Sequence, residues 1–154
     1  MNSVHTCRTP MQVAIEEILE SNNIPLELFY ESAGAYLKLE MPSYSPLVIE
    51  RICNSGGINE DGISVAHYST MNGDLISDPE MTFDLKWKPT SITQHPVNVY
   101  RTIYHDESGN RYYPRVLKEL IAFSVLWSKN ITNQGWKNAK VRIEGIPAQT
   151  ANSK

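Results

Sequence analysis

The residue pair Asn72-Gly73, near the middle of the chain, constrains the fold more than any other feature. Both residues tolerate a positive φ, the conformation that a two-residue β-hairpin turn requires. Apolar and polar residues alternate on either side of the pair, in residues 63–70 and 81–87, as in strands with one buried face. Asp78-Pro79 interrupts the second arm, because proline cannot donate to a strand ladder. We therefore predict an antiparallel hairpin whose return strand runs in two pieces.

A helix is predicted near the start of the chain, from Pro10 to about residue 20. Thr9 is a good N-cap, Pro10 stands at the first helical position, and Gln12 follows three residues after the cap. This pattern is a capping box, in which two side chains bind free backbone N–H groups at a helix start. Its apolar stripe is Met11, Ala14, Ile15, Ile18 and Leu19, and its predicted polar face is Glu16, Glu17 and Glu20.

A second helix is predicted from Pro114 to about residue 133. Proline suits the first helical position, and Gly135 suits the C-terminal cap because glycine readily adopts the left-handed conformation. Apolar or small residues recur at helical spacing along this segment and predict a buried stripe. That stripe comprises Leu117, Leu120, Ile121, Ser124, Trp127 and Ile131.

Further strands are predicted at residues 36–41, 47–53 and 97–104, with short ones at 111–113 and 141–143, whereas residues 89–96 are predicted to be a loop. Short connections between consecutive strands favour a meander over βαβ units. The prediction is an α+β fold, an antiparallel meander of about six strands with an N-terminal and a C-terminal helix packed on it. A chain of 154 residues suits a single domain, with a core at about 9–145 and flexible tails at 1–8 and 147–154.

Composition narrows the class of protein. The chain is 41% hydrophobic and 20% charged, which is ordinary for a globular domain. No apolar run reaches the roughly 18–20 residues that a membrane helix needs, and residues 1–9 lack the apolar centre of a signal peptide. The two cysteines, Cys7 and Cys53, are too few for a disulfide framework and are expected to be free thiols. A cytoplasmic protein without membrane contact is therefore expected.

Four acidic residues and one histidine lie close together in sequence around the predicted hairpin. Carboxylates are ligands for Mg²⁺ or Mn²⁺, and a neighbouring histidine can serve acid-base chemistry. Asp84 and Lys86, placed on one strand face by alternation, are similar to the acid-x-Lys pair of metal-dependent nucleases. The candidate catalytic residues are His67, Asp74, Asp78, Glu80, Asp84 and Lys86, of which Asp74, Asp78 and Glu80 are the candidate metal ligands.

A structural interpretation of the same residues is favoured. Asp74 and Asp78 stand beside a tight turn and a proline, where aspartate side chains commonly bind nearby backbone groups. Asp84 and Lys86 also fit the solvated face of a strand, and His67 fits a structural histidine within one. We therefore expect no metal or other cofactor, with Mg²⁺ or Mn²⁺ as the alternative.

A second candidate surface is basic and aromatic. Arginine neutralises phosphates and tyrosine stacks on bases, so such a cluster can bind single-stranded nucleic acid, but both residues are also frequent at protein interfaces. Residues 1–100 carry a net charge of -8 and residues 101–154 one of +5, which permits an acidic and a basic face. The cluster comprises Tyr100, Arg101, Tyr104, Arg111, Tyr112, Tyr113, Arg115 and Lys118.

Two stretches of the chain resemble an uncharacterised domain family found in bacterial and archaeal genomes, plasmids, conjugative elements and phages. The first stretch runs from His67-Tyr68 through Asn72-Gly73-Asp74-Leu75 to Asp78-Pro79-Glu80-Met81. The second runs from Trp127 through K-N-I-x-x-Q-G to Trp136. The resemblance covers roughly residues 30–136, and the extension after Trp136 departs from it. It implies an association with mobile elements and carries no established activity.

Taken together, these observations favour a non-catalytic accessory or protein-interaction module of a mobile element or phage, which acts on a host factor and has another protein as its partner. A metal-dependent phosphoesterase or nuclease using Asp74, Asp78, Glu80 and Asp84 is the first alternative. A single-stranded nucleic-acid binder is the second, and the acidic balance of the chain argues against it. Catalysis is left open, and the oligomeric state does not follow from the sequence.

Overall fold

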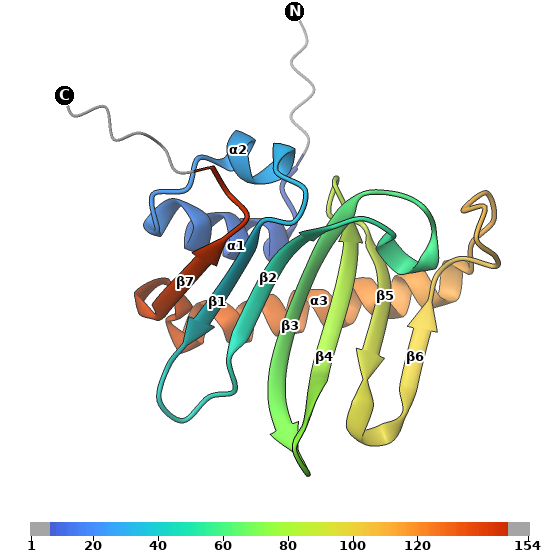
Figure 1. The fold of residues 1–154 in the computed structure, drawn as a ribbon. Helices are drawn as coiled ribbons and strands as arrows, with labels where there is room; N and C mark the ends of the chain where they lie inside the picture. Colours follow the sequence, from blue (N-terminus) through green and yellow to red (C-terminus); the bar gives the residue numbers. More distant parts are fainter. Residues whose placement is uncertain (1–6, 148–154) are drawn as a thin grey trace, which may run out of the picture.

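Within residues 7–147, which the computed structural model describes, the chain forms one open antiparallel sheet of seven strands with helices against one of its faces (Figure 1). This confirms the predicted α+β class, with seven strands in place of about six. The elements are α1 (Pro10–Ser21), α2 (Leu26–Glu31), β1 (Tyr36–Glu40), β2 (Leu47–Ile52), η1 (Ser55–Gly57), β3 (Gly62–Met71), β4 (Asp74–Asp84), β5 (Pro89–Gln94), η2 (His95–Val97), β6 (Val99–Thr102), α3 (Pro114–Gln134), η3 (Trp136–Asn138) and β7 (Lys140–Glu144).

The strand order is β6-β5-β4-β3-β2-β1-β7. The first six strands form the predicted meander, in which each strand pairs with the next one in sequence. The chain then crosses the back of the sheet as α3 and adds β7 beside β1 (Figure 1). The short strand predicted at 141–143 is therefore confirmed as β7, the last strand on one side of the sheet. The two edge strands are β6 and β7.

The hairpin of β3 and β4 forms the centre of the sheet, as predicted. Asn72 and Gly73 have φ values of 54° and 84°, the positive values that the tight turn requires. The return arm is one strand and not two pieces. β4 runs through Asp78-Pro79, and the extra length is absorbed by a register shift between Ala66 and Tyr68. A β-bulge of this kind lets a proline stand in a strand without breaking the ladder on both sides.

The predicted loop at 89–96 is wrong, because most of it is strand β5. Pro89 stands at the first position of the strand, where a missing N–H is tolerated. β5 pairs with β4 on one side and with β6 on the other, so its polar residues lie inside a sheet. Residues 111–113 do not form a strand, and an isolated bridge between Tyr104 and Tyr112 takes its place.

The strand predicted through residue 87 ends at Asp84, where a tight turn leads into β5. The Asp84 carboxylate accepts hydrogen bonds from the backbone N–H groups of Lys86 and Lys88, both at 2.9 Å. Trp87 has a φ of 68° and is buried, but it reaches the core from this turn and not from a strand face. Asp84 and Lys86 therefore do not share a strand face.

Helix α1 begins as predicted, with the Thr9 hydroxyl accepting the backbone N–H of Gln12 at 3.1 Å. The Gln12 side chain does not complete the capping box and instead donates to Glu16 at 3.4 Å. Glu16 is buried, so its predicted place on the polar face is wrong. It forms an ion pair with Arg8 at 2.6 Å and accepts the Tyr30 hydroxyl at 2.6 Å.

Two other features of the helices differ from expectation. Helix α2 begins directly after Pro25, where the sequence pattern predicted only an end to α1. In α3, Ile121 is 45% exposed and does not belong to the buried stripe, whereas Leu120, Ser124, Trp127 and Ile131 do. Gly135 caps α3 in the left-handed conformation, as predicted. The predicted flexible tails lie mostly outside residues 7–147, and Arg8 contacts Glu16.

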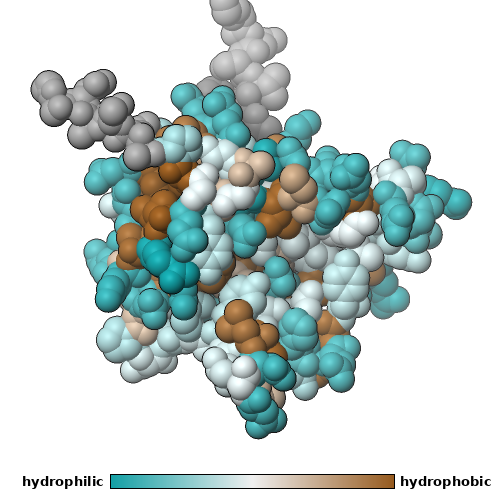
Figure 2. All heavy atoms as spheres, in the orientation of Figure 1, coloured by the Kyte–Doolittle hydropathy of each residue, from teal (hydrophilic) through white to brown (hydrophobic). Residues whose placement is uncertain are grey.

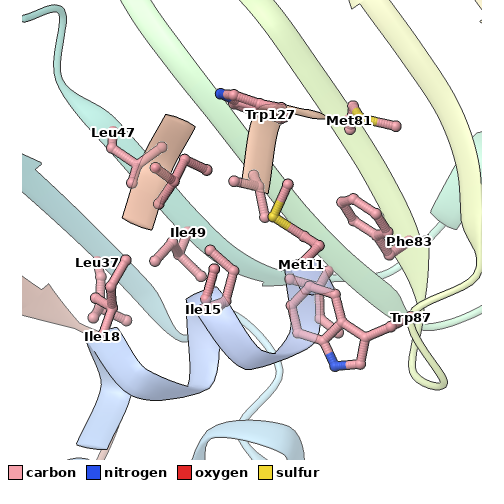
Figure 3. Packing of buried hydrophobic residues seen from close by; sticks show 14 of the residues in the cluster. Met11, Ile15, Ile18, Leu37, Leu47, Ile49, Met81, Phe83, Trp87 and Trp127 are labelled. Atoms are coloured by element: carbon pink, nitrogen blue, oxygen red, sulfur yellow. The ribbon is translucent and has the colours of Figure 1, made fainter. Parts of the chain in front are cut away.

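The hydrophobic core lies between the helices and one face of the sheet. Figure 3 shows Ile15 and Ile18 of α1 beside Ile49 and Leu37 of the sheet, and Met11 on the side of Phe83 and Trp87. Trp127 of α3 and Phe83 of β4 extend the same cluster. The side chains at alternate positions of each strand point the other way, to a face that α1, α2 and α3 do not cover. The β2–β3 connection, with η1, packs on this face over one end of β4 and β5 (Figure 1). We call this face the open face; Figure 1 views the sheet from this side, with α3 behind the strands.

Candidate functional site

The open face carries a mixture of small, aromatic and charged side chains. The cross-strand register places Lys38 of β1 beside Val48 of β2, and Val48 beside Ala66 of β3. In the next row along the strands, Tyr36 stands beside Glu50. Because residues two apart on a strand share a face, these positions form a continuous surface.

A cavity of about 450 Å³ is hollowed into this face. It lies between the β1–β2 connection and the free end of the β3–β4 hairpin, since its lining comes from β1, β2 and both arms of the hairpin. Its size is within the range of pockets that bind small molecules or single side chains. It is lined by Tyr36, Lys38, Ser45, Pro46, Val48, Tyr68, Ser69, Thr70 and Leu75.

Hydrophobic side chains surround one side of the cavity. Leu75, which lines it, is 70% exposed, and Pro46 and Val48 add further apolar wall. Figure 2 shows hydrophobic surface toward the free end of this hairpin, on the open face. Large apolar groups exposed next to a cavity are typical of surfaces that bind a partner or ligand.

Two carboxylates, Glu50 and Glu80, lie on the open face. Ser64 of β3 lies between Glu50 and Thr82 in the register, and its hydroxyl donates to Glu80 at 2.9 Å. Burial, and then the nearby Glu80 charge, raise the pKa of Glu50. Neither Glu50 nor Glu80 belongs to an ion pair among residues 7–147.

Tyr68 lies next to these carboxylates and lines the cavity. Burial, together with the charges of Glu80 and Glu50, raises the pKa of Tyr68 to about 12. Its hydroxyl is therefore protonated at neutral pH and is a hydrogen-bond donor, not a base. The cavity thus offers a phenol donor and an ammonium group beside apolar walls.

His67, a candidate catalytic residue, faces the core and not the open face. Its Nδ1–H donates to the Ser45 carbonyl at 3.1 Å. Its ring lies against Trp127 and Trp136, with centroid distances of 5.8 and 5.6 Å. Burial lowers the pKa of His67, although the Ser45 and Pro46 carbonyls and the Asp78 charge oppose this. This environment is that of a neutral packing residue.

The same contacts join the two stretches that carried the family resemblance. His67 comes from the first stretch, and Trp127 and Trp136 come from the second. The Trp136 indole N–H donates to Gln134 at 2.8 Å, and Gly135 provides the left-handed cap between them. In this fold, these residues have a packing role.

The candidate metal ligands are not assembled. Asp74 and Asp78 are exposed on β4, Glu80 binds Ser64 on the open face, and Asp84 caps its turn. Lys86 lies in that turn, exposed. Across residues 7–147, no three His, Cys, Asp or Glu side chains are arranged to hold a metal ion.

A serine and a histidine also meet near the hairpin, where the Ser77 hydroxyl lies 2.9 Å from Nδ1 of His95. Ser77 is only 1% exposed, so its oxygen cannot reach a substrate. The Ser77 backbone N–H approaches the same nitrogen at 3.3 Å. The contact therefore attaches η2 to β4 and is structural.

The predicted basic and aromatic surface is divided by the fold. Arg101 forms an ion pair with Glu119 of α3 at 2.5 Å, and Arg115 approaches the same carboxylate at 3.8 Å. Tyr104 is buried, whereas Tyr100 is exposed. The remaining residues lie around the 103–113 connection, where Tyr113 stacks on His105, Lys88 lies over the Tyr112 ring, and Arg111 and Lys118 are exposed.

Sequence reasoning missed Tyr36, Lys38, Val48 and Glu50 as members of a site. Alternation placed Lys38 on the polar side of its strand, but that pattern is equally typical of a plain solvated face. Only the pairing of β1 with β2, and the position of the hairpin beside them, brings these residues to one cavity. Cys7 and Cys53 are free, as expected, and both are exposed.

Comparison with known families matches residues 13–137 to a domain of unknown function (DUF6908). No curated protein and no solved structure matches the chain. Among residues 7–147, the helices are too short or too polar to cross a membrane.

Proposed function

We propose that this chain, which belongs to the DUF6908 family, is a non-catalytic protein-interaction module that binds its partner on the open face of its sheet. The observation that carries the proposal is the cavity of about 450 Å³, which is lined in part by Leu75, a large apolar side chain that is 70% exposed. Leu75 projects from the sheet on the side that α1, α2 and α3 do not cover. A monomeric domain gains nothing in folding from apolar groups left in water.

The arrangement of polar groups supports binding over catalysis. Among the described residues, the acidic candidates form no group that could hold a metal ion, and the buried serine beside His95 is not accessible. The side chains that line the cavity are one lysine, two tyrosines, three serine or threonine residues and three apolar residues, which suit recognition. Two arginines of the basic and aromatic surface, Arg101 and Arg115, are engaged by Glu119, which weakens the case for a nucleic-acid binder.

We further propose that the protein acts in the cytoplasm as an accessory factor of a mobile element or phage, with a host protein as its partner. The resemblance of the hairpin and of the Trp127–Trp136 segment supports the association with mobile elements. The two free and exposed thiols are compatible with a reducing compartment.

Two matched substitutions test the open face. Leu75→Asp places a charge beside the cavity, and Leu126→Asp places one on the outer face of α3, where Leu126 is 61% exposed. Partners are captured from the producing cell with the parent and both variants and are quantified by mass spectrometry. A specific partner is expected to be lost with Leu75→Asp and kept with Leu126→Asp. Equal capture by all three proteins would contradict the proposal.

A further inference from the structure

We infer that the cavity recognises an acidic side chain next to a large apolar side chain, within an internal segment of the partner protein. This inference rests on the proposed function and adds the chemistry of the partner. The inference has two halves. In the anionic half, Lys38 binds the acidic side chain of the partner; in the apolar half, the large apolar side chain packs between Val48, Pro46 and Leu75.

The anionic half follows from the surroundings of Lys38. This residue lines the cavity, half-buried, and its cross-strand neighbours are Val48 and Arg142. The Arg142 guanidinium is engaged by Glu144 at 2.8 Å, whereas Lys38 belongs to none of the ion pairs found in residues 7–147. An ammonium group in a cavity without an internal carboxylate is available to an incoming one.

The two carboxylates of the open face, Glu50 and Glu80, form no ion pair with Lys38. The pKa of Glu50 is raised by burial and by Glu80, the direction opposite to that produced by an adjacent cation. Lys38 therefore supplies a positive group, and Glu50 and Glu80 a negative part of the open face. A partner with many phosphates would meet repulsion from the carboxylates, so an isolated carboxylate fits better than a nucleic acid.

The backbone around Lys38 indicates an acidic side chain and not a chain terminus. Proteins commonly capture a terminal carboxylate with free backbone N–H groups. β1 is paired with β2 on one side and with β7 on the other, so its N–H groups are used in the sheet. The ammonium group remains, and it can bind the side chain of an aspartate or glutamate as a point charge.

The apolar half follows from the walls of the cavity and from the hairpin beyond it. Val48, Pro46 and Leu75 supply apolar wall, and the rings of Tyr36 and Tyr68 flank them. A small molecule confined to the cavity would leave the outer part of Leu75, which is 70% exposed, in water. A polypeptide that fills the cavity with one large side chain can also cover the outer part of Leu75, which is why a protein segment is the better occupant.

A pair of capped dipeptides tests this chemistry directly. Acetyl-Asp-Trp-amide carries the carboxylate and the large apolar group, and acetyl-Asn-Trp-amide has the same shape without the charge. Binding to the parent protein is measured from backbone amide shifts in NMR titrations up to 10 mM peptide. The expected result is shifts at Val48, Tyr68 and Thr70, with about five-fold tighter binding of the Asp peptide, the size expected of a half-exposed ion pair.

Lys38→Met tests the assigned anchor, and Lys129→Met, an exposed lysine of α3, is its control. The Lys38 variant is expected to keep the shifts at Val48 and Tyr68 but to bind both dipeptides equally, whereas the Lys129 variant keeps the preference. Equal binding by the parent, or a preference that survives Lys38→Met, would overturn the anionic half. The inference would also be overturned by stronger binding of acetyl-Trp with a free carboxylate, or by oligonucleotide binding at the same amides.

The outcomes separate this inference from the proposed function. If neither dipeptide shifts the cavity amides while Leu75→Asp still loses the partner, the assigned chemistry is wrong and the open face remains the binding face. If the dipeptides bind as expected while Leu75→Asp keeps the partner, the cavity recognises this chemistry and the proposed function is wrong.

Discussion

Different physical constraints require particular residues at individual positions of the chain. Gly73 and Gly62 illustrate this, because one is required by backbone conformation and the other by space. At Gly73 the φ of 84° is unfavourable for any L side chain, although a Cβ there would meet nothing within 4 Å. At Gly62 a Cβ would lie 2.2 Å from the Phe83 carbonyl oxygen, so the neighbouring strand would have to move.

Substitutions at these two glycines should therefore differ in cost. Gly73→Ala is expected to lower the free energy of unfolding by about 1 kcal/mol, and Gly73→Val by more, because a branched side chain fits a positive φ poorly. Gly62→Ala is expected to cost more than Gly73→Ala, since backbone atoms of β4 cannot move aside cheaply. Urea denaturation measures each change. A Gly73→Val variant as stable as the parent would refute the turn assignment.

His67 should make stability depend on pH. Burial lowers its pKa in the folded protein below the value of about 6.5 expected in the unfolded chain, so the unfolded state binds a proton more readily. Stability from this residue is full above about pH 6.5 and is lost as the pH falls toward the lower folded pKa. His67→Asn keeps a donor near the Ser45 carbonyl but does not titrate. Melting temperatures of the parent should fall relative to this variant below about pH 6.5; parallel curves would contradict the assignment.

At the scale of elements, polar links hold together segments that the sequence does not relate. The Tyr30 hydroxyl of α2 donates to Glu16 of α1 at 2.6 Å and accepts the Trp87 indole N–H of the β4–β5 turn at 2.8 Å. Burial and the hydrogen bond to Glu16 raise the pKa of Tyr30, which keeps it protonated. One hydroxyl therefore joins three elements around a buried carboxylate.

Removal of that hydroxyl should weaken the junction. Tyr30→Phe leaves the indole N–H of Trp87 without its partner and removes one hydrogen bond from Glu16, so we expect a loss of about 1–3 kcal/mol. Tyr44→Phe is the control, because Tyr44 is exposed. Chemical denaturation compares the two variants. Equal stabilities would show that the junction contributes nothing measurable.

Helix α3 offers a second matched pair on neighbouring residues. Trp127 is buried against His67 and Phe123, whereas Leu126 is largely exposed. Trp127→Ala is expected to cost about 3–5 kcal/mol, because it removes a large core side chain and leaves a cavity. Leu126→Ala should change stability by less than about 0.5 kcal/mol. A Trp127→Ala variant that melts like the parent would mean that this face of α3 is not part of the core.

At the scale of the whole molecule, β7 decides how the sheet ends. It follows α3 and pairs along the whole of β1, from Tyr36 opposite Glu144 to Glu40 opposite Lys140. It also carries alternating charges, which discourage an edge strand from pairing with another molecule. The strand thus protects β1, whose Tyr36 and Lys38 line the cavity.

A protein ending at Ala139 should show this protective role. Without β7, the backbone of β1 becomes an unpaired edge next to the cavity, so a lower melting temperature and concentration-dependent association are expected. Size-exclusion chromatography with light scattering, together with thermal melts, measures both. A shortened protein that melts and elutes as a monomer like the parent would show that β1 needs no partner on this side.

Local patterns in the sequence determined the hairpin, α1 and α3, because turn chemistry, N-caps and apolar spacing act between residues close in the chain. Local patterns failed for β5, where pairing with strands on both sides overrides local preference. They also failed for Glu16, which is buried in an ion pair with Arg8. His67, chosen from its sequence neighbours, faces the core, and the acids chosen with it are dispersed. The cavity exists only because the register of β1, β2 and β3 brings Lys38, Val48 and Tyr68 together. Such contacts depend on long-range pairing, which no short window of sequence contains.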